Sequence, residues 1–179
     1  LTSGFYPILM FGLPAAALAM IHSARKEQKK IAVGILSAAG LTAFLTGVTE
    51  PLEFAFMFVA FPLYVLHALL TGLSLAIAYL LDIHLGFSFS AGLIDLLLYG
   101  TAPAAKNIPL LIVMGLVFFV LYYVIFRFAI TKWNLMTPGR DPEWVDTGSD
   151  SDAAVGGSAG SDRAHQLITA FGGADNLKN

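Results

Sequence analysis

The chain has 179 residues, of which 57% are hydrophobic and only 12% charged. With a mean hydropathy of +0.75, it is too apolar for an ordinary soluble domain and predicts an integral membrane protein. The net charge of -2 and the lack of a basic face give no support to nucleic acid as a partner. Because the sequence has no Cys, disulfides and thiolate metal sites are excluded, and no residue pattern indicates a metal or a cofactor.

The first apolar stretch, residues 5–23, is about long enough to span a bilayer. Since Pro7, Gly12 and Pro14 interrupt it, we expect a broken helix. The charged residues 25–30 follow and predict a solvated loop on the cytoplasmic side, because cytoplasmic loops are enriched in Lys and Arg. The chain begins without Met and without a basic region, so we expect no signal peptide and interpret the chain as part of a longer protein.

Two carboxylates, Glu50 and Glu53, lie inside one of the most apolar regions. A charged side chain at membrane depth costs about 3 kcal/mol on insertion scales, so it typically faces a cavity or a substrate path. Gly47 and Pro51 flank Glu50 and disfavour an unbroken helix, which predicts that backbone peptide groups are exposed at this point. The alternative is an interfacial loop in which neither carboxylate binds a ligand.

The sequence around these carboxylates predicts a re-entrant hairpin near residues 31–62, with Glu50 at its tip. Residues 31–46 form the entering arm and are rich in the small residues that allow helices to approach closely in membranes. A short arm returns from the break, and a spanning helix is predicted to follow at residues 63–81.

Residues 108–130 predict the clearest spanning helix. It ends in aromatic and basic residues typical of a cytoplasmic boundary: Tyr122, Tyr123, Arg127, Lys132 and Trp133. Residues 137–161 are predicted to be a flexible linker, because they bury too little apolar surface to become ordered. Residues 162–179 have a capped, helical apolar pattern and predict the beginning of a truncated soluble domain. The predicted fold class is therefore an all-α, polytopic integral membrane protein over residues 1–136, with a re-entrant hairpin, followed by this linker and domain.

Two further polar residues lie in apolar segments. His67 needs a partner for its imidazole, and it is either a structural histidine or a ligand-binding one. Asp95 either caps a local turn, which Gly92 and Gly100 permit, or belongs to a functional site. Together with the interrupted helix at Glu50, these residues indicate a transporter, but they do not name its substrate.

Several motifs carry a family resemblance. Three segments of the chain resemble the membrane component, enzyme IIC, of the glucose-family permeases of the bacterial phosphoenolpyruvate:sugar phosphotransferase system: residues 10–20 (MFGLPAAALAM), 44–54 (FLTGVTEPLEF) and 137–140 (TPGR). Within that family, three further segments resemble the N-acetylglucosamine-specific branch more closely than the glucose branch: residues 67–72, 83–92 and 103–107. Residues 170–178 (AFGGADNLK) resemble the first residues of the enzyme IIB domain that is attached to IIC in that family.

The resemblance implies a multi-pass permease of the bacterial inner membrane with a cytoplasmic C-terminal tail. It implies N-acetylglucosamine or glucose as substrate, and transport coupled to phosphorylation of the sugar 6-hydroxyl by a phosphorylated IIB domain. It also implies a homodimer formed through an N-terminal half that this chain lacks. The resemblance assigns Glu50 to the sugar, and we expect it to be the catalytic carboxylate. The predicted substrate site consists of Thr49, Glu50, Glu53 and His67. A carboxylate suits a sugar hydroxyl because charge-assisted hydrogen bonds are roughly twice as strong as neutral ones.

Two other interpretations stay open. In the first, the protein is an ion-coupled secondary transporter in which Glu50 or Asp95 binds a proton or Na⁺. In the second, the isolated chain neither transports nor phosphorylates, because half of the sugar site and the phosphocysteine lie outside it. We expect the second for the chain by itself, whatever the activity of the full-length protein.

Overall fold

Four apolar helical stretches dominate the computed structural model, which describes residues 2–140. They are Thr2–Ser23, α2 (Lys29–Thr46), α4 (Phe61–Leu80) and α6 (Ile108–Lys132). Each is long and apolar enough to cross a membrane. Two short helices, α3 (Glu50–Met57) and α5 (Leu93–Tyr99), complete the described part, which contains no β-strand beyond one isolated bridge. The all-α prediction is confirmed for these residues, and helices of spanning length lie where the spans at 63–81 and 108–130 are expected.

The first stretch is helical throughout but changes its pitch. A 3₁₀ turn, η1 (Thr2–Gly4), is followed by a π-helix, η2 (Pro7–Gly12), which continues directly into α1 (Leu13–Ser23). Pro14 lies just after the junction of η2 and α1 and has no backbone N–H to donate to the preceding turn. The expectation of a broken helix is therefore wrong, because the wider π turn accommodates the irregular sequence without an interruption.

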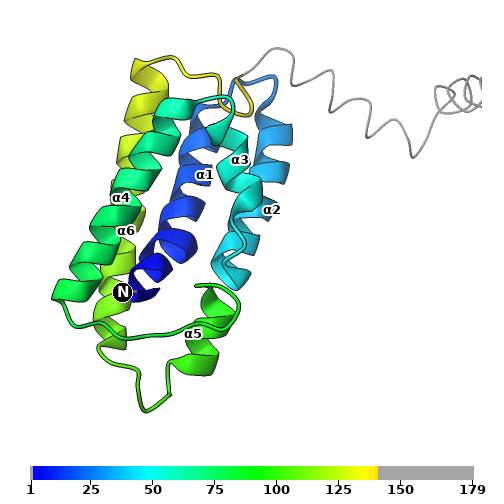
Figure 1. Cartoon of the computed structure of the whole chain (residues 1–179). Coiled ribbons are helices and arrows are strands. Elements are labelled where there is room, and N and C mark those ends of the chain that lie inside the picture. Colours follow the sequence, from blue (N-terminus) through cyan, green and yellow to red (C-terminus); the bar gives the residue numbers. More distant parts are fainter. Residues whose placement is uncertain (1, 141–179) are drawn as a thin grey trace, which may run out of the picture. The chain divides into compact units, whose positions relative to one another are not determined.

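The core forms where α1 packs between α2 on one side and α6 on the other (Figure 1). Ala15, Ala16 and Ala19 of α1 are fully buried, and their small side chains let the neighbouring helices approach closely. At Gly12 the approach is closer still, since a Cβ there would lie 2.9 Å from the ring of Tyr122 on α6. Such van der Waals contacts are the main force that joins helices where lipid replaces water.

Large apolar side chains stay exposed on the outer faces of the long helices. They include Val33 and Leu41 on α2, Leu69 and Leu73 on α4, and Val117, Val120, Val124 and Phe128 on α6. On a soluble protein, so much exposed apolar surface would mark an interface or cause aggregation. Around helices long enough to span a bilayer, it is the surface that hydrocarbon chains contact.

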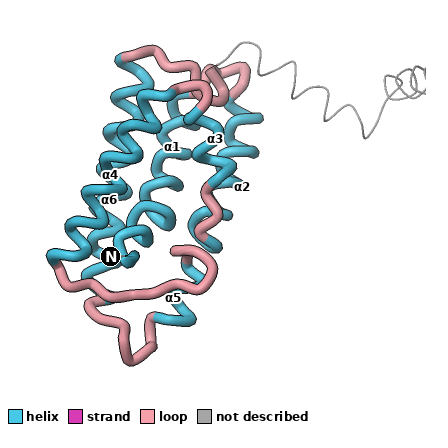
Figure 2. The backbone as a smooth tube through the Cα atoms, viewed as in Figure 1, coloured by secondary structure: helices cyan, strands magenta, loops and turns pink. Residues whose placement is uncertain are grey.

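The predicted hairpin appears as two antiparallel helices of unequal length. α2 has 18 residues, whereas α3 has 8, and a short non-helical turn joins them (Figure 2). Since α2 is long enough to span a membrane by itself, the entry and return of this hairpin within one leaflet stays a prediction.

The two ends of the bundle differ in character. At one end, Arg25 donates its backbone N–H to the Gly139 carbonyl over 2.9 Å, so residues 137–140 pack against the loop between α1 and α2. At the other end, α5 and two irregular segments connect α4 to α6 (Figure 2). The rest of the predicted linker, from residue 141, and the predicted domain at 162–179 lie outside the described residues.

Candidate functional site

The break between α2 and α3 follows from two residues. Gly47 has φ 73° and ψ 9°, a left-handed conformation that glycine adopts easily and that commonly ends a helix. Pro51 lies in the first turn of α3, where the absence of its N–H leaves no hydrogen bond unmade. Gly47 thus ends one helix and Pro51 helps to begin the next. The predicted opening of the backbone before Glu50 is confirmed.

Thr49 directs the carboxylate of Glu53. The Thr49 side chain is only 7% exposed, and its hydroxyl donates to Glu53 Oε1 over 2.9 Å. The Glu53 backbone N–H also bonds to the Thr49 carbonyl, at 2.9 Å. Because both contacts join the same two residues one helical turn apart, the carboxylate is held in one orientation.

His67 connects this carboxylate to α6. Its residue exposure is 8%, and its Nε2 lies 3.7 Å from Glu53 Oε1. Its Nδ1 lies 3.0 Å from the hydroxyl of Tyr122. Because an ionised carboxylate only accepts hydrogen bonds, we assign the ring proton to Nε2, which faces Glu53, and Nδ1 then accepts from the Tyr122 hydroxyl.

Aromatic rings enclose the imidazole of His67. Phe56 of α3 lies edge-on to His67, with 5.9 Å between ring centroids, and also to Phe126, with 5.6 Å. Tyr122 and Phe126 stack at 5.3 Å. These rings keep water from one side of the polar chain, and a low local dielectric strengthens its hydrogen bonds.

Glu50 lies beside this chain but outside it. Its side chain is exposed, and its Oε2 accepts the backbone N–H of Thr49 at 3.1 Å. Within residues 2–140, Glu50 takes part in no ion pair. The structure therefore joins Thr49, Glu53 and His67, and it leaves Glu50 as an accessible acceptor next to them. A carboxylate in that position can bind a hydroxyl group.

The sequence argument missed Tyr122, which it placed at an aromatic membrane boundary. The side chain is fully buried and bonded to His67. The buried residues of α6 recur every three or four positions: Leu111, Met114, Phe118, Tyr122 and Phe126. The exposed positions of the same helix are apolar too, so hydropathy does not distinguish this row. Tyr122 belongs to this inward-facing row.

Asp95 has a structural environment. It is 5% exposed, and its carboxylate accepts the backbone N–H of Ser88 at 3.2 Å and of Ser90 at 3.0 Å. Of the two alternatives left open for Asp95, these bonds support the turn-capping one. No group of three His, Asp or Glu side chains within residues 2–140 is arranged to hold a metal ion.

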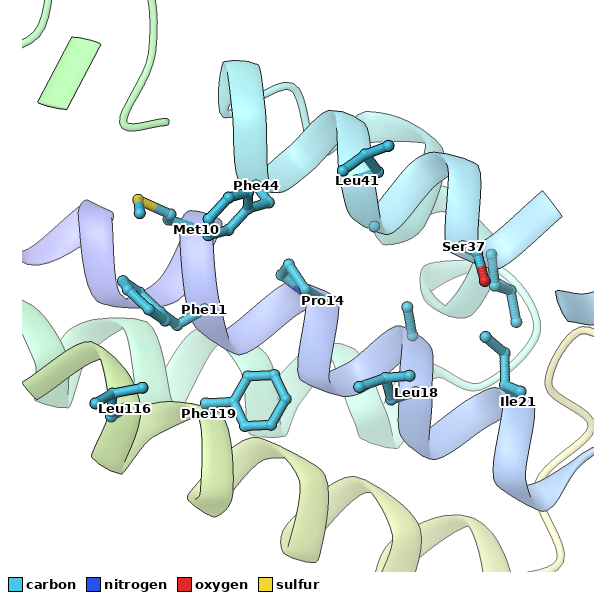
Figure 3. A pocket seen from close by; sticks show the side chains of 13 residues that line it. Met10, Phe11, Pro14, Leu18, Ile21, Ser37, Leu41, Phe44, Leu116 and Phe119 are labelled. Carbon is cyan, nitrogen blue, oxygen red and sulfur yellow. The ribbon is translucent and has the colours of Figure 1, made fainter. Parts of the chain in front are cut away.

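A separate apolar groove of about 480 Å³ lies along α1, α2 and α6 (Figure 3). Met10, Phe11, Leu41 and Phe44 line it, and Ser37 contributes its polar side chain. Neither Thr49, Glu50, Glu53 nor His67 borders this groove. With one hydroxyl among its lining side chains, it suits an apolar group and not a ligand rich in hydroxyls.

Comparison with known proteins gives a consistent result. Residues 1–72 match the family described as phosphotransferase system, EIIC. The chain is 53% identical over 180 residues to the N-acetylglucosamine-specific EIICBA component of Escherichia coli K12, covering 98% of this chain and 27% of that protein. It is 57% identical over 141 residues to the N-acetylglucosamine-specific EIIC component of Streptomyces coelicolor, covering 79% and 33%. It is 47% identical over 176 residues to the glucose-specific EIICBA component of Staphylococcus carnosus, covering 98% and 25%. The chain spans about a quarter to a third of the length of these curated relatives.

Proposed function

Since the chain belongs to the phosphotransferase system EIIC family, we propose that it forms part of the membrane component of a bacterial sugar permease. The full-length protein carries N-acetylglucosamine or glucose across the inner membrane and phosphorylates its 6-hydroxyl. Identities of 53% and 57% with N-acetylglucosamine-specific relatives, against 47% with a glucose-specific one, support N-acetylglucosamine.

The observation that carries this proposal is the polar chain inside an apolar bundle. His67 lies in α4, which is long and apolar enough to span a membrane, and Glu53 lies in the short α3 that packs against α4. Thr49 and Tyr122 hold these two ionisable groups in place. Ionisable groups at such a depth are expensive and usually mark a substrate path. The accessible Glu50 at the beginning of α3 adds an acceptor where the backbone is open.

Each residue of the site has a proposed role. Glu50 accepts a sugar hydroxyl and orients the 6-hydroxyl, and Thr49 fixes the backbone at the helix start. Glu53 and His67 form the wall of the sugar site nearest α4. During the reaction, the sugar O6 forms a bond to phosphorus while the bond from phosphorus to the IIB cysteine breaks. The cysteine sulfur leaves with the bonding electron pair and takes up the proton that O6 releases. Phosphoryl transfer depends mainly on positioning and electrostatics, which suits an orienting carboxylate.

The proposal includes three further expectations. The IIB domain docks on the cytoplasmic side, where the charged residues 25–30 and the segment 137–140, which ends in Arg140, lie together. The full-length protein is a homodimer, as the family resemblance implies. The isolated chain is inactive, because the relatives whose names include B and A components are about four times longer.

The competing proposal is an ion-coupled transporter that uses Glu50 or Asp95. The three N–H bonds to the Asp95 carboxylate count against Asp95 as an ion carrier, because they occupy most of its acceptor positions. Both proposals use Glu50. Whether the transported sugar is phosphorylated or unmodified therefore decides between them.

Inverted membrane vesicles that contain the full-length protein and labelled sugar test the proposal. With phosphoenolpyruvate and the other phosphotransferase components, we expect labelled N-acetylglucosamine 6-phosphate to form and a protonophore to have little effect. Accumulation of unmodified sugar that a protonophore abolishes would establish the ion-coupled alternative instead. Glucose in a parallel assay identifies the preferred substrate.

A further inference from the structure

In the loop before α5, residues 81–92, one carboxylate bonds to several backbone N–H groups. Asp95 accepts backbone N–H groups of three consecutive residues, Ser88, Phe89 and Ser90, at 3.2, 3.4 and 3.0 Å. Bonds from N–H groups to a charged acceptor are stronger than neutral ones, and three of them from one loop restrict its conformation. The loop backbone is therefore fixed by a side chain that follows it in the sequence.

This loop contacts the break from across the bundle. The Ser90 hydroxyl donates to the Gly47 carbonyl over 2.8 Å, a contact between residues 43 positions apart. The backbones touch as well, since a Cβ on Gly92 would lie 2.5 Å from the Gly47 nitrogen. The loop thus abuts the residue whose left-handed turn directs the chain toward Thr49 and Glu50.

The break has few other restraints. The Val48 N–H reaches the Thr46 hydroxyl only at 3.3 Å, and the Thr49 N–H bonds to the side chain of Glu50 itself. Both contacts are local, and Thr49 is held on the α3 side through its hydroxyl bond to Glu53. The bond from Ser90 joins Gly47 to a segment distant in sequence, and its loss would leave the Gly47 carbonyl without that anchor.

We propose that Ser90 and Asp95 are positioning residues for the sugar site: Asp95 shapes the loop, and Ser90 anchors Gly47 so that Thr49 and Glu50 are held where the sugar binds. This inference rests on the proposed function. Neither residue touches the sugar, and each acts through the backbone of the break. Small displacements of a positioning group can cost up to about a hundredfold in rate, so a distant anchor of this kind affects the reaction.

Two serines of the same loop provide a matched test. Ser90→Ala removes the hydroxyl that anchors Gly47, whereas Ser88→Ala removes an exposed hydroxyl and leaves the backbone bond of Ser88 to Asp95 in place. The variants are made in the full-length protein, and binding of N-acetylglucosamine, the maximal phosphorylation rate and the unfolding temperature are measured. We expect Ser90→Ala to weaken sugar binding about fivefold, which corresponds to one partly buried hydrogen bond, and Ser88→Ala to change it less than twofold. Asp95→Asn should weaken binding at least as much as Ser90→Ala.

Hydrogen exchange gives a readout that needs no sugar. Amides of residues 47–50 should exchange faster in Ser90→Ala than in Ser88→Ala. If the two serine variants agree in both sugar affinity and exchange, the inference is overturned while the proposed function stands. A lower unfolding temperature with unchanged affinity would also overturn it, because the loop would then support only the fold. If the unaltered protein binds no sugar, the proposed function fails, and faster exchange at 47–50 still establishes the anchor.

Discussion

At the scale of single residues, the structure separates two carboxylates that the sequence places three positions apart. Glu53 belongs to a chain that runs from Thr49 through His67 to Tyr122, whereas Glu50 stays accessible at the beginning of α3. A group already engaged by protein partners has fewer lone pairs for a ligand. The two carboxylates should therefore differ in their response to the same substitution.

Glu50→Gln replaces a charged acceptor with a neutral amide of the same size. In the full-length protein, we expect a loss of about 1.5 to 3 kcal/mol of sugar interaction, roughly tenfold to more than a hundredfold in affinity. Glu53→Gln should cost less, because the amide oxygen can still accept the Thr49 hydroxyl. Glu27→Gln, in the exposed loop after α1, is the control. If Glu53→Gln loses binding while Glu50→Gln keeps it, the orienting role belongs to Glu53.

Tyr122 and Tyr123 offer a second matched comparison. Tyr122→Phe removes the buried hydroxyl bonded to His67 Nδ1, which should cost about 1 to 3 kcal/mol because a buried ring nitrogen loses its partner. Tyr123→Phe removes an exposed bond to His22 and should cost less than about 0.5 kcal/mol. Thermal unfolding in detergent and sugar affinity measure both effects. Equal losses of stability and of sugar affinity in the two variants would show that the hydrogen bond between Tyr122 and His67 contributes to neither.

At the scale of elements, the turn between α2 and α3 depends on one glycine. The backbone of Gly47 is left-handed, and its carbonyl and Cβ positions both face the loop before α5. Gly47 thus ends α2, accepts the anchoring hydrogen bond from Ser90 and directs the chain toward α3. A side chain at that position should disturb all three.

Gly47→Ala introduces a Cβ that would lie 2.6 Å from Ser90 Oγ and 2.9 Å from the Ala91 nitrogen. Together with the left-handed backbone, this should lower the free energy of unfolding by about 2 kcal/mol and weaken sugar binding. Gly34→Ala on the same helix is the control, because no heavy atom lies within 4 Å of the added Cβ. It should leave stability equal or raise it by about 0.5 to 1 kcal/mol. Calorimetry that finds equal stability for the two variants would contradict the importance of the turn.

At the scale of the whole described bundle, positive charge gathers at one end. The basic side chains near it are Arg25, Lys26, Lys29, Lys30, Arg127, Lys132 and Arg140. Two hydrogen bonds tie its parts together, from Arg25 to Gly139 and from Arg140 to the Ser23 carbonyl. Lys106 lies at the other end and pairs with Asp82 at 3.7 Å. This asymmetry predicts which end faces the cytoplasm.

Reporter fusions test the orientation. A reporter joined after Arg140 should be active only as a cytoplasmic fusion, and one inserted at the exposed Ala104, at the opposite end, only as a periplasmic fusion. The insertion serves as the internal control, because both positions flank the same helix, α6. Activity of both fusions on one side of the membrane would contradict the prediction that α6 crosses it.

Much of this protein is determined by local sequence. A run of about 20 apolar residues spans a bilayer whatever its neighbours do, because each peptide group is satisfied within its own helix. The spans of α4 and α6 were therefore predictable, as was the break, since Gly47 and Pro51 act on the backbone beside them. The linker and the soluble domain are compositional predictions that lie outside the described residues.

Only the tertiary structure decided which polar groups meet. Tyr122 reaches His67 across 55 positions, and Ser90 reaches Gly47 across 43. Such contacts depend on how each helix is rotated about its axis. In a soluble helix a polar face reveals that rotation, but helices that are apolar all round conceal it. The sequence by itself determined where the helices and their break lie, and packing of nearly uniform apolar surfaces decided that Glu53, His67 and Tyr122 form one chain.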